Sequence, residues 1–332
     1  MIVVGVVLLA AVAAADPGAD RLRDLRPLPK PHYSWPLPGS MLTPDSAVLR
    51  EYTRITHAVS VRGESVTAPQ IAAAVVACKA ANAAGPSVPA TIAINYSPWH
   101  RRFPRDRPPT DVGSAATAEV DAYRAALERI RGSLADANRE HAADVRVSAL
   151  LLDCERFRIS DDEEWNAAMT RKHDAIADVS REVFPDARVE WYARGGFSTA
   201  GDATWRRSPY FTLRERGDSF SCALYGGPRL DEMREAYRRT RAEATAHAVS
   251  SVTPWIALGA GYAPDGSRRR WSFDWPYDQA ASARLGAEVN GGAAPWDTVR
   301  VVVFYPSPFD DRMPRGPQHF VAYVEGATGA SN

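Results

Sequence analysis

The sequence predicts an α/β fold and favours a (β/α)8 TIM barrel with long loops at the carboxyl ends of its strands. Short apolar runs that suit buried strands alternate with longer amphipathic segments that suit helices, as in a parallel sheet with covered faces. Seven such strand runs fall within the 332 residues. No glycine-rich phosphate loop follows any of them, which disfavours the open doubly wound sheet.

The candidate strands are short and largely apolar. They are His57–Val61, Thr91–Tyr96, Val147–Glu155, Arg188–Ala193, Phe220–Tyr225, Thr253–Leu258 and Val299–Tyr305. We expect an eighth strand either in the weakly patterned N-terminal part or at Phe320–Val324. Seven or eight units in a chain of this length suit a single barrel.

The candidate helices lie between these strands. Pro69–Ala83 is rich in alanine, and apolar residues recur at intervals of three and four between Val120 and Leu134. Such spacing places them on one face of a helix. Ser160 and Glu163 have the spacing of a capping box and predict the start of another helix. A further helix is expected from Leu230 to about His247.

The N-terminus predicts export from the cell. Residues Ile2–Ala15 are apolar or small and end in three alanines, which is typical of a signal peptide and its cleavage site. The run is too short to span a membrane as a helix, so we expect a secreted or periplasmic protein. The predicted organisation is a signal peptide (1–15), a proline-rich arm that wraps the surface or tethers the domain (16–43), the barrel (44–326) and a disordered tail (327–332).

Composition and motifs exclude several classes of function. Lysine plus arginine and aspartate plus glutamate each number 40, so a nucleic-acid partner is not expected. Three cysteines are too few for a disulfide framework, and buried thiols are expected. The seven histidines show no metal-binding spacing, and no serine lies in a G-x-S-x-G motif. We expect neither a metal nor another cofactor, and oligomeric state is left open.

Asp153 and Glu155 form the most informative motif. They end a strongly apolar strand, and side chains two residues apart on a strand point the same way. Two neighbouring carboxyl groups can hold one proton between them, and their pKa values then separate, as acid catalysis near neutral pH requires. The alternative is a structural pair that caps a helix or meets an arginine.

Aromatic residues accompany this pair at the expected barrel mouth. Three long segments, 97–114, 195–219 and 259–277, follow strand ends and are rich in tryptophan and tyrosine. Such rings suit the flat faces of sugars, although they can also pack against one another to order the loops. The candidate substrate-binding residues are Tyr96, Trp99, Tyr192, Arg194, Trp255 and Tyr305, and Tyr225 is a candidate for supporting charge during catalysis.

The strand that ends in Asp153-Cys154-Glu155 resembles the D-x-E strand of secreted (β/α)8 glycoside hydrolases. The nearest parallels are chitinase-like and hyaluronidase-like barrels, and the residues after Glu155, Arg156-Phe157-Arg158, are similar in kind. The resemblance implies that Glu155 is the general acid and that Asp153 orients a substrate acetamido group, with Tyr225 or Tyr192 beside it.

Without an acetamido sugar, the nucleophile would have to come from another strand, and Glu190 or Asp274 is the candidate. The predicted function is therefore a secreted glycoside hydrolase that acts on a polysaccharide or glycan. Two alternatives stay open: a non-catalytic carbohydrate-binding barrel, and a cell-envelope protein whose loops contact another protein.

Overall fold

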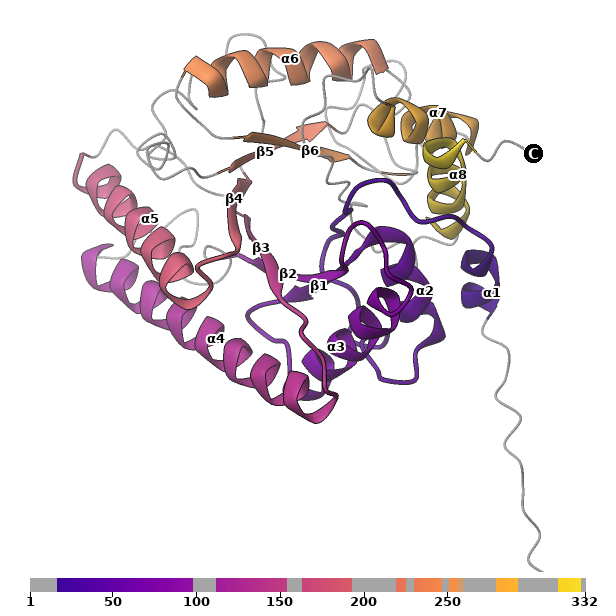
Figure 1. Ribbon diagram of the computed structural model, residues 1–332. Coiled ribbons are helices and arrows are strands. Elements are labelled where there is room, and N and C mark those ends of the chain that lie inside the picture. Colours follow the sequence, from indigo (N-terminus) through magenta and orange to yellow (C-terminus); the bar gives the residue numbers. More distant parts are fainter. Residues whose placement is uncertain are drawn as a thin grey trace, which may run out of the picture.

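Six parallel strands form one sheet in the computed structural model. It describes residues 17–97, 112–153, 163–192, 219–224, 230–246, 251–256, 258, 279–291 and 316–329. The strands are β1 (Ala58–Arg62), β2 (Thr91–Tyr96), β3 (Val147–Asp153), β4 (Arg188–Tyr192), β5 (Ser219–Leu224) and β6 (Ser251–Ile256). Their order in the sheet is their order in the chain, and the sheet curls around a central axis (Figure 1). The predicted α/β barrel class is confirmed.

Helices lie outside the curve of the sheet (Figure 1). They are α1 (Pro17–Arg23), α2 (Ala47–Thr56), α3 (Ala68–Asn82), α4 (Val112–Glu140), α5 (Glu163–Val183), α6 (Leu230–Ala246), α7 (Gln279–Asn290) and α8 (Gly316–Thr328). The strand bounds agree with the sequence prediction to within two residues wherever a predicted strand end is described. The predicted strand Val299–Tyr305 lies outside the described residues.

The predicted strand at Phe320–Val324 is wrong, because these residues belong to helix α8. Phe320, Tyr323 and Val324 lie three and four residues apart, so they share the buried face of that helix. Helix α8 packs tightly on α7: a Cβ atom added at Gly286 would collide with the carbonyl oxygen of Tyr323. The segment is therefore a helix that packs closely on α7, and not an eighth strand.

The two faces of the sheet carry different side chains. On the outer face Ile92, Ile94, Leu150 and Leu152 belong to the main apolar core under the helices. On the inner face small residues, among them Ala93, and a few aromatics form a second cluster. Because side chains alternate along a strand, every second side chain of each strand points into the barrel.

The proline-rich arm packs as part of the barrel wall. The backbone N–H groups of Leu28, His32 and Leu37 donate to carbonyls of Ile55, Thr56 and Ser60 at 2.7–2.9 Å, so the arm runs beside the start of β1. Leu28 is 1% exposed and Leu37 is 4% exposed, and both belong to the main core. The arm therefore contributes apolar residues to the main core.

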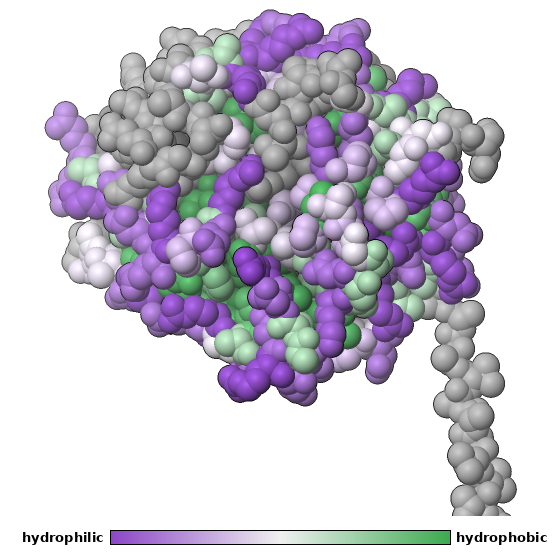
Figure 2. All heavy atoms as spheres, viewed as in Figure 1, coloured by the Kyte–Doolittle hydropathy of each residue, from purple (hydrophilic) through white to green (hydrophobic). Residues whose placement is uncertain are grey.

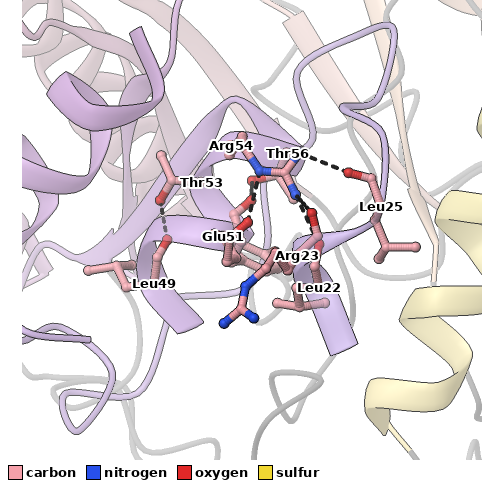
Figure 3. Close-up of polar contacts among 9 residues, drawn as sticks. Leu22, Arg23, Leu25, Leu49, Glu51, Thr53, Arg54 and Thr56 are labelled. Carbon is pink, nitrogen blue, oxygen red and sulfur yellow. Dashed lines mark hydrogen bonds and ion pairs between the residues drawn. The ribbon is translucent and has the colours of Figure 1, made fainter. Parts of the chain in front are cut away.

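Arg54 fastens the N-terminal helix to α2 (Figure 3). Its guanidinium donates to the carbonyls of Leu22, Arg23 and Leu25 at 2.8–3.0 Å, and its Nε donates to Glu51 at 2.8 Å. The last carbonyls of a helix have no intrahelical partner, so an arginine that binds them stabilises the helix end. This contact gives the short α1 a fixed position.

Hydrophilic residues dominate one face of the described surface (Figure 2). Figure 2 shows hydrophilic residues over most of the described part of one face, with apolar residues visible in patches between them. Of the helices in the described ranges, none combines the length and the apolar character needed to cross a bilayer. Cys78 is a buried free thiol, and burial raises its pKa.

Candidate active site

Small residues line the inner face of the curled sheet on β1, β2 and β3. The inner-face cluster consists of Tyr33, Ala58, Ala93, Ala149, Leu151, Tyr192 and Trp255, with Trp35 packed against it. Bulky branched side chains usually fill the interior of a (β/α)8 barrel. Here alanines stand on β1, β2 and β3, and Tyr33 of the arm enters from the side. Its hydroxyl lies 2.6 Å from the Ser148 hydroxyl.

Asp153 ends β3 on this inner face. It is 6% exposed, and its Oδ2 accepts a hydrogen bond from the Ser97 hydroxyl at 3.2 Å. Asp153 is directly opposite Tyr192 in the β3–β4 register. The structure thus places one predicted carboxylate in the barrel, near the carboxyl ends of the strands. The other member of the pair, Glu155, lies outside the described residues.

Two of the predicted aromatic residues meet beside Asp153. The rings of Tyr192 and Trp255 stack with centroids 4.1 Å apart and an interplanar angle of 17°. They come from β4 and β6, and Ser221, the residue of β5 opposite Tyr192 in the register, is small enough to let them touch. Both rings are buried, so their stacking places an aromatic pair beside the buried carboxylate of Asp153.

Trp35 extends this aromatic group. Its ring contacts Trp255 edge-on, with centroids 6.2 Å apart and an interplanar angle of 81°. The sequence gives no local signal for Trp35 as a site residue, because the prolines around it exclude a regular strand or helix. Its position depends on the arm following β1, which local sequence patterns do not reveal.

Glu190, the candidate alternative nucleophile, is on the inner face of β4 and is fully buried. Its Oε1 accepts the Ser221 hydroxyl at 2.8 Å, and its Oε2 accepts the Thr253 hydroxyl at 3.2 Å. These bonds join three neighbouring strands. Hydrogen bonds to a buried carboxylate offset the cost of removing its charge from water, so Glu190 helps to hold the sheet together.

Tyr96 does not join the group. Its ring belongs to the outer core and packs edge-on against Tyr123 of α4, with centroids 4.7 Å apart. The strand alternates, so Asn95 takes the inner position that the sequence analysis assigned to its neighbour. Four other predicted site residues lie outside the described residues: Trp99, Arg194, Tyr225 and Tyr305. The alternative nucleophile Asp274 lies outside them too.

Other buried ionisable groups lie away from the site, on the helix side of the sheet. Lys172 of α5 forms an ion pair with Glu119 of α4, and burial lowers its pKa to about 6. His173 packs edge-on against Trp191, and burial lowers its pKa to about 3. In the part of the chain that the structure describes, no group of three or more histidine, cysteine, aspartate or glutamate residues is arranged to hold a metal ion.

The fold is of the class that barrel glycoside hydrolases have. A thermostable mutant of a xylanase from Cellvibrio japonicus matches 94% of this chain and 99% of its own, with a TM-score of 0.50 and 11% sequence identity. An intracellular xylanase from Thermoanaerobacterium saccharolyticum matches 92% of this chain and 97% of its own, with a TM-score of 0.51 and 8% identity.

A third structure, a GH10 protein from Paenibacillus barcinonensis, matches 93% of this chain and 97% of its own, with a TM-score of 0.51 and 12% identity. No protein-family model matches the sequence, and a search of curated proteins finds no match either. Similarity to these three structures over almost the whole chain, at 8–12% identity, establishes the shared (β/α)8 fold.

Proposed function

We propose that this protein is a glycoside hydrolase that acts on a polysaccharide or glycan. The observation that carries the proposal is the buried carboxylate of Asp153 beside the stacked rings of Tyr192 and Trp255. Barrel enzymes carry their chemistry at the carboxyl ends of the strands, where all three residues are. The xylanases with the same fold act on polysaccharides, which supports a substrate of that kind.

Glu155 is the proposed general acid. It follows Asp153 by two residues, so continued strand geometry would place its side chain on the same face and nearer the mouth of the barrel. There it would protonate the glycosidic oxygen as the bond breaks. Tyr225 is proposed to support the charge that develops at the anomeric carbon.

Asp153 is proposed to orient the substrate and not to serve as the nucleophile. A carboxylate on the same strand as the acid is poorly placed to reach the opposite face of the sugar ring. It can instead orient a 2-acetamido group that attacks the anomeric carbon, which is the substrate-assisted route. Both oxygens of Glu190, the alternative nucleophile, accept hydrogen bonds from hydroxyl groups. This gives Glu190 a structural role and supports the substrate-assisted route, which needs no nucleophile from the protein.

We also propose that the protein is exported. The apolar run Ile2–Ala15 with its terminal alanines supports a signal peptide that is removed near Asp16. Expression of the full chain in a bacterial host, followed by mass spectrometry of the periplasmic and medium fractions, tests this. Export predicts a mature N-terminus near Asp16; an intact N-terminus found in the cytoplasm alone contradicts it.

A non-catalytic carbohydrate-binding barrel is the second candidate function. One observation favours it. Both carboxylate oxygens of Glu190 accept hydrogen bonds from hydroxyl groups of neighbouring strands, which is a structural role. Asp153, which accepts from Ser97, would then serve structure as well. The aromatic group would bind sugar without cleavage.

Reducing-end release from a panel of polysaccharides and acetamido-containing glycans distinguishes the two functions. The variants are Glu155→Gln and, as a matched control, Glu163→Gln, which alters an exposed carboxylate at the start of α5. Hydrolysis by the wild type and the control, with loss of at least about 100-fold in Glu155→Gln, supports the proposal. Equal hydrolysis in all three proteins removes Glu155 from its role, and binding without turnover in all three supports the second function.

A further inference from the structure

Two hydrogen-bond donors on the inner face of the sheet have no partner among the residues that the structure describes. The side-chain Nδ2 of Asn95 and the indole Nε1 of Trp255 are both buried, and within these described ranges neither makes a hydrogen bond. Asn95 is 5% exposed and Trp255 is fully buried. Leaving a buried donor unpaired is unfavourable, and native proteins seldom do so. A donor that is kept in this state inside a site calls for an explanation.

Three half-buried asparagines elsewhere in the described chain, Asn82, Asn138 and Asn290, each donate a hydrogen bond through Nδ2. Asn138 at the end of α4 donates to the carbonyl of Val145 at 2.9 Å and accepts from its N–H at 3.0 Å. Asn82 at the end of α3 forms the same reciprocal pair with Ala90. Both asparagines lie near the amino ends of strands, where they tie a helix to the following strand. Asn95 has no comparable structural task.

The unpaired groups of Asn95 and Trp255 lie on the face that carries the candidate site. Ala93 belongs to the inner cluster, and Ile92, Ile94 and Tyr96 belong to the outer core, so alternation directs Asn95 inward. Two residues beyond Asn95 on the same face, Ser97 donates to Asp153. On the other side of Asp153, Tyr192 stacks on Trp255.

We propose that Asn95 is a specificity-determining residue whose Nδ2, together with the Nε1 of Trp255, donates hydrogen bonds to oxygen atoms of the bound sugar. This inference rests on the proposed function and assigns it a pair of recognition groups. Both donors are neutral, which suits hydroxyl or amide oxygens rather than phosphate, for which arginine is the usual partner. A sugar that lacks the oxygen atom for one of these donors would leave that donor buried and unpaired, and would be rejected for that reason.

Stability provides a test that is independent of any glycan. Leucine is close to asparagine in shape and has no donor to leave unpaired. Asn95→Leu is therefore expected to raise the melting temperature by about 2 °C. The matched control Asn138→Leu removes two satisfied hydrogen bonds and is expected to lower it by a similar amount or more. A decrease in both variants contradicts the inference, because Asn95 would then be serving stability.

The kinetic test uses the best substrate from the glycan panel. Asn95→Leu is expected to lower kcat/KM by about 10- to 100-fold, as loss of a buried hydrogen bond to substrate does. Trp255→Phe keeps an aromatic ring without the N–H and is expected to lower it about 10-fold. Asn138→Leu is expected to leave kcat/KM unchanged at a temperature where it is folded.

The two proposals fail in different ways. Wild-type kcat/KM in Asn95→Leu, with hydrolysis intact, overturns the recognition role of Asn95 and leaves the glycoside hydrolase standing. Absence of both hydrolysis and binding across the panel by the wild-type protein overturns the glycoside hydrolase, and with it the sugar oxygen as the acceptor. A raised melting temperature together with a reduced kcat/KM in Asn95→Leu is the result that both proposals predict.

Discussion

The outer and inner faces of the same sheet differ in what their side chains accomplish. The outer face carries large apolar residues such as Leu150 and Trp191, which pack under the helices. The inner face carries alanines, hydroxyl groups, two buried carboxylates and the stacked pair Tyr192–Trp255. Burial of apolar area on the outer face supplies most of the folding free energy. The inner face is thereby free to keep polar groups that a core would exclude.

Neighbouring leucines on β3 test this division most strongly. Leu150 lies in the outer core and Leu151 in the inner cluster, and both are about fully buried. Leu150→Ala is expected to lower the free energy of unfolding by about 3 kcal/mol and to leave kcat/KM unchanged in the folded protein. Leu151→Ala should lower both, because it reshapes the barrel interior. Urea denaturation and steady-state kinetics measure the two effects; equal kinetic losses would contradict the division.

The glycines of the helical layer sharpen the comparison within the outer shell. Gly286 lies where α7 meets α8, and an added Cβ would collide with the Tyr323 carbonyl oxygen. Gly286→Ala should therefore destabilise the fold by about 2 kcal/mol or more. Gly132 of α4 has open space around it, so Gly132→Ala should stabilise by about 1 kcal/mol. Thermal denaturation of both variants checks this, and the same sign for both would be incompatible with the packing.

His32 joins the arm to α8 and gives the outer shell a pH dependence. Its Nδ1 donates to the Lys30 carbonyl at 2.7 Å. In the neutral ring Nε2 therefore accepts a hydrogen bond from the Tyr323 hydroxyl, at 3.0 Å. Burial lowers the pKa of His32 from 6.5 to about 3. The unfolded chain takes up a proton below pH 6.5 that the folded chain does not, so stability falls as the pH drops from 6.5 towards 3.

His32→Gln is expected to remove this part of the pH dependence, which is about 2 kcal/mol at pH 5. The variant should also be less stable at pH 7, since glutamine cannot reproduce both hydrogen bonds. Urea denaturation at pH 7, 6 and 5 measures the slope of stability against pH for both proteins. An identical slope would show that His32 is not the group responsible.

The smallest effect is expected at the surface. Arg139 and Asp136 of α4 form an ion pair at 2.9 Å with both side chains more than two thirds exposed. Such pairs are worth little because water and salt screen them. Asp136→Asn should change the free energy of unfolding by less than about 0.5 kcal/mol. A larger decrease in the free energy of unfolding, measured by urea denaturation, would mean that the helical layer depends on its charges more than on its packing.

Sequence patterns predicted the described strands and the position of Asp153, because long apolar runs bounded by polar residues are strong local signals. They did not predict which face Tyr96 would occupy. In Thr91–Tyr96 the residues of one phase are Thr91, Ala93 and Asn95, and those of the other are larger and apolar. The smaller, more polar phase faces the barrel interior, and that signal would have identified Asn95 in place of Tyr96.

Two other features depended on distant contacts. The run Phe320–Val324 is short and apolar, so its pattern fits a strand as well as a helix; packing on α7 at Gly286 decides for the helix. The arm that contains Trp35 follows β1 through backbone hydrogen bonds. Backbone hydrogen bonds leave no pattern in the side-chain sequence, so the place of Trp35 beside Trp255 could not be read from it.

The most direct test of the account is the initial rate of reducing-end release by Asp153→Asn. Asparagine keeps the size of the side chain and an oxygen that can accept the Ser97 hydroxyl, but it has no negative charge. We expect at least about a 100-fold loss of kcat with little change in melting temperature, whereas the surface variant Asp136→Asn keeps the wild-type rate. A wild-type rate in Asp153→Asn would contradict the claim that the inner face of this sheet performs the chemistry.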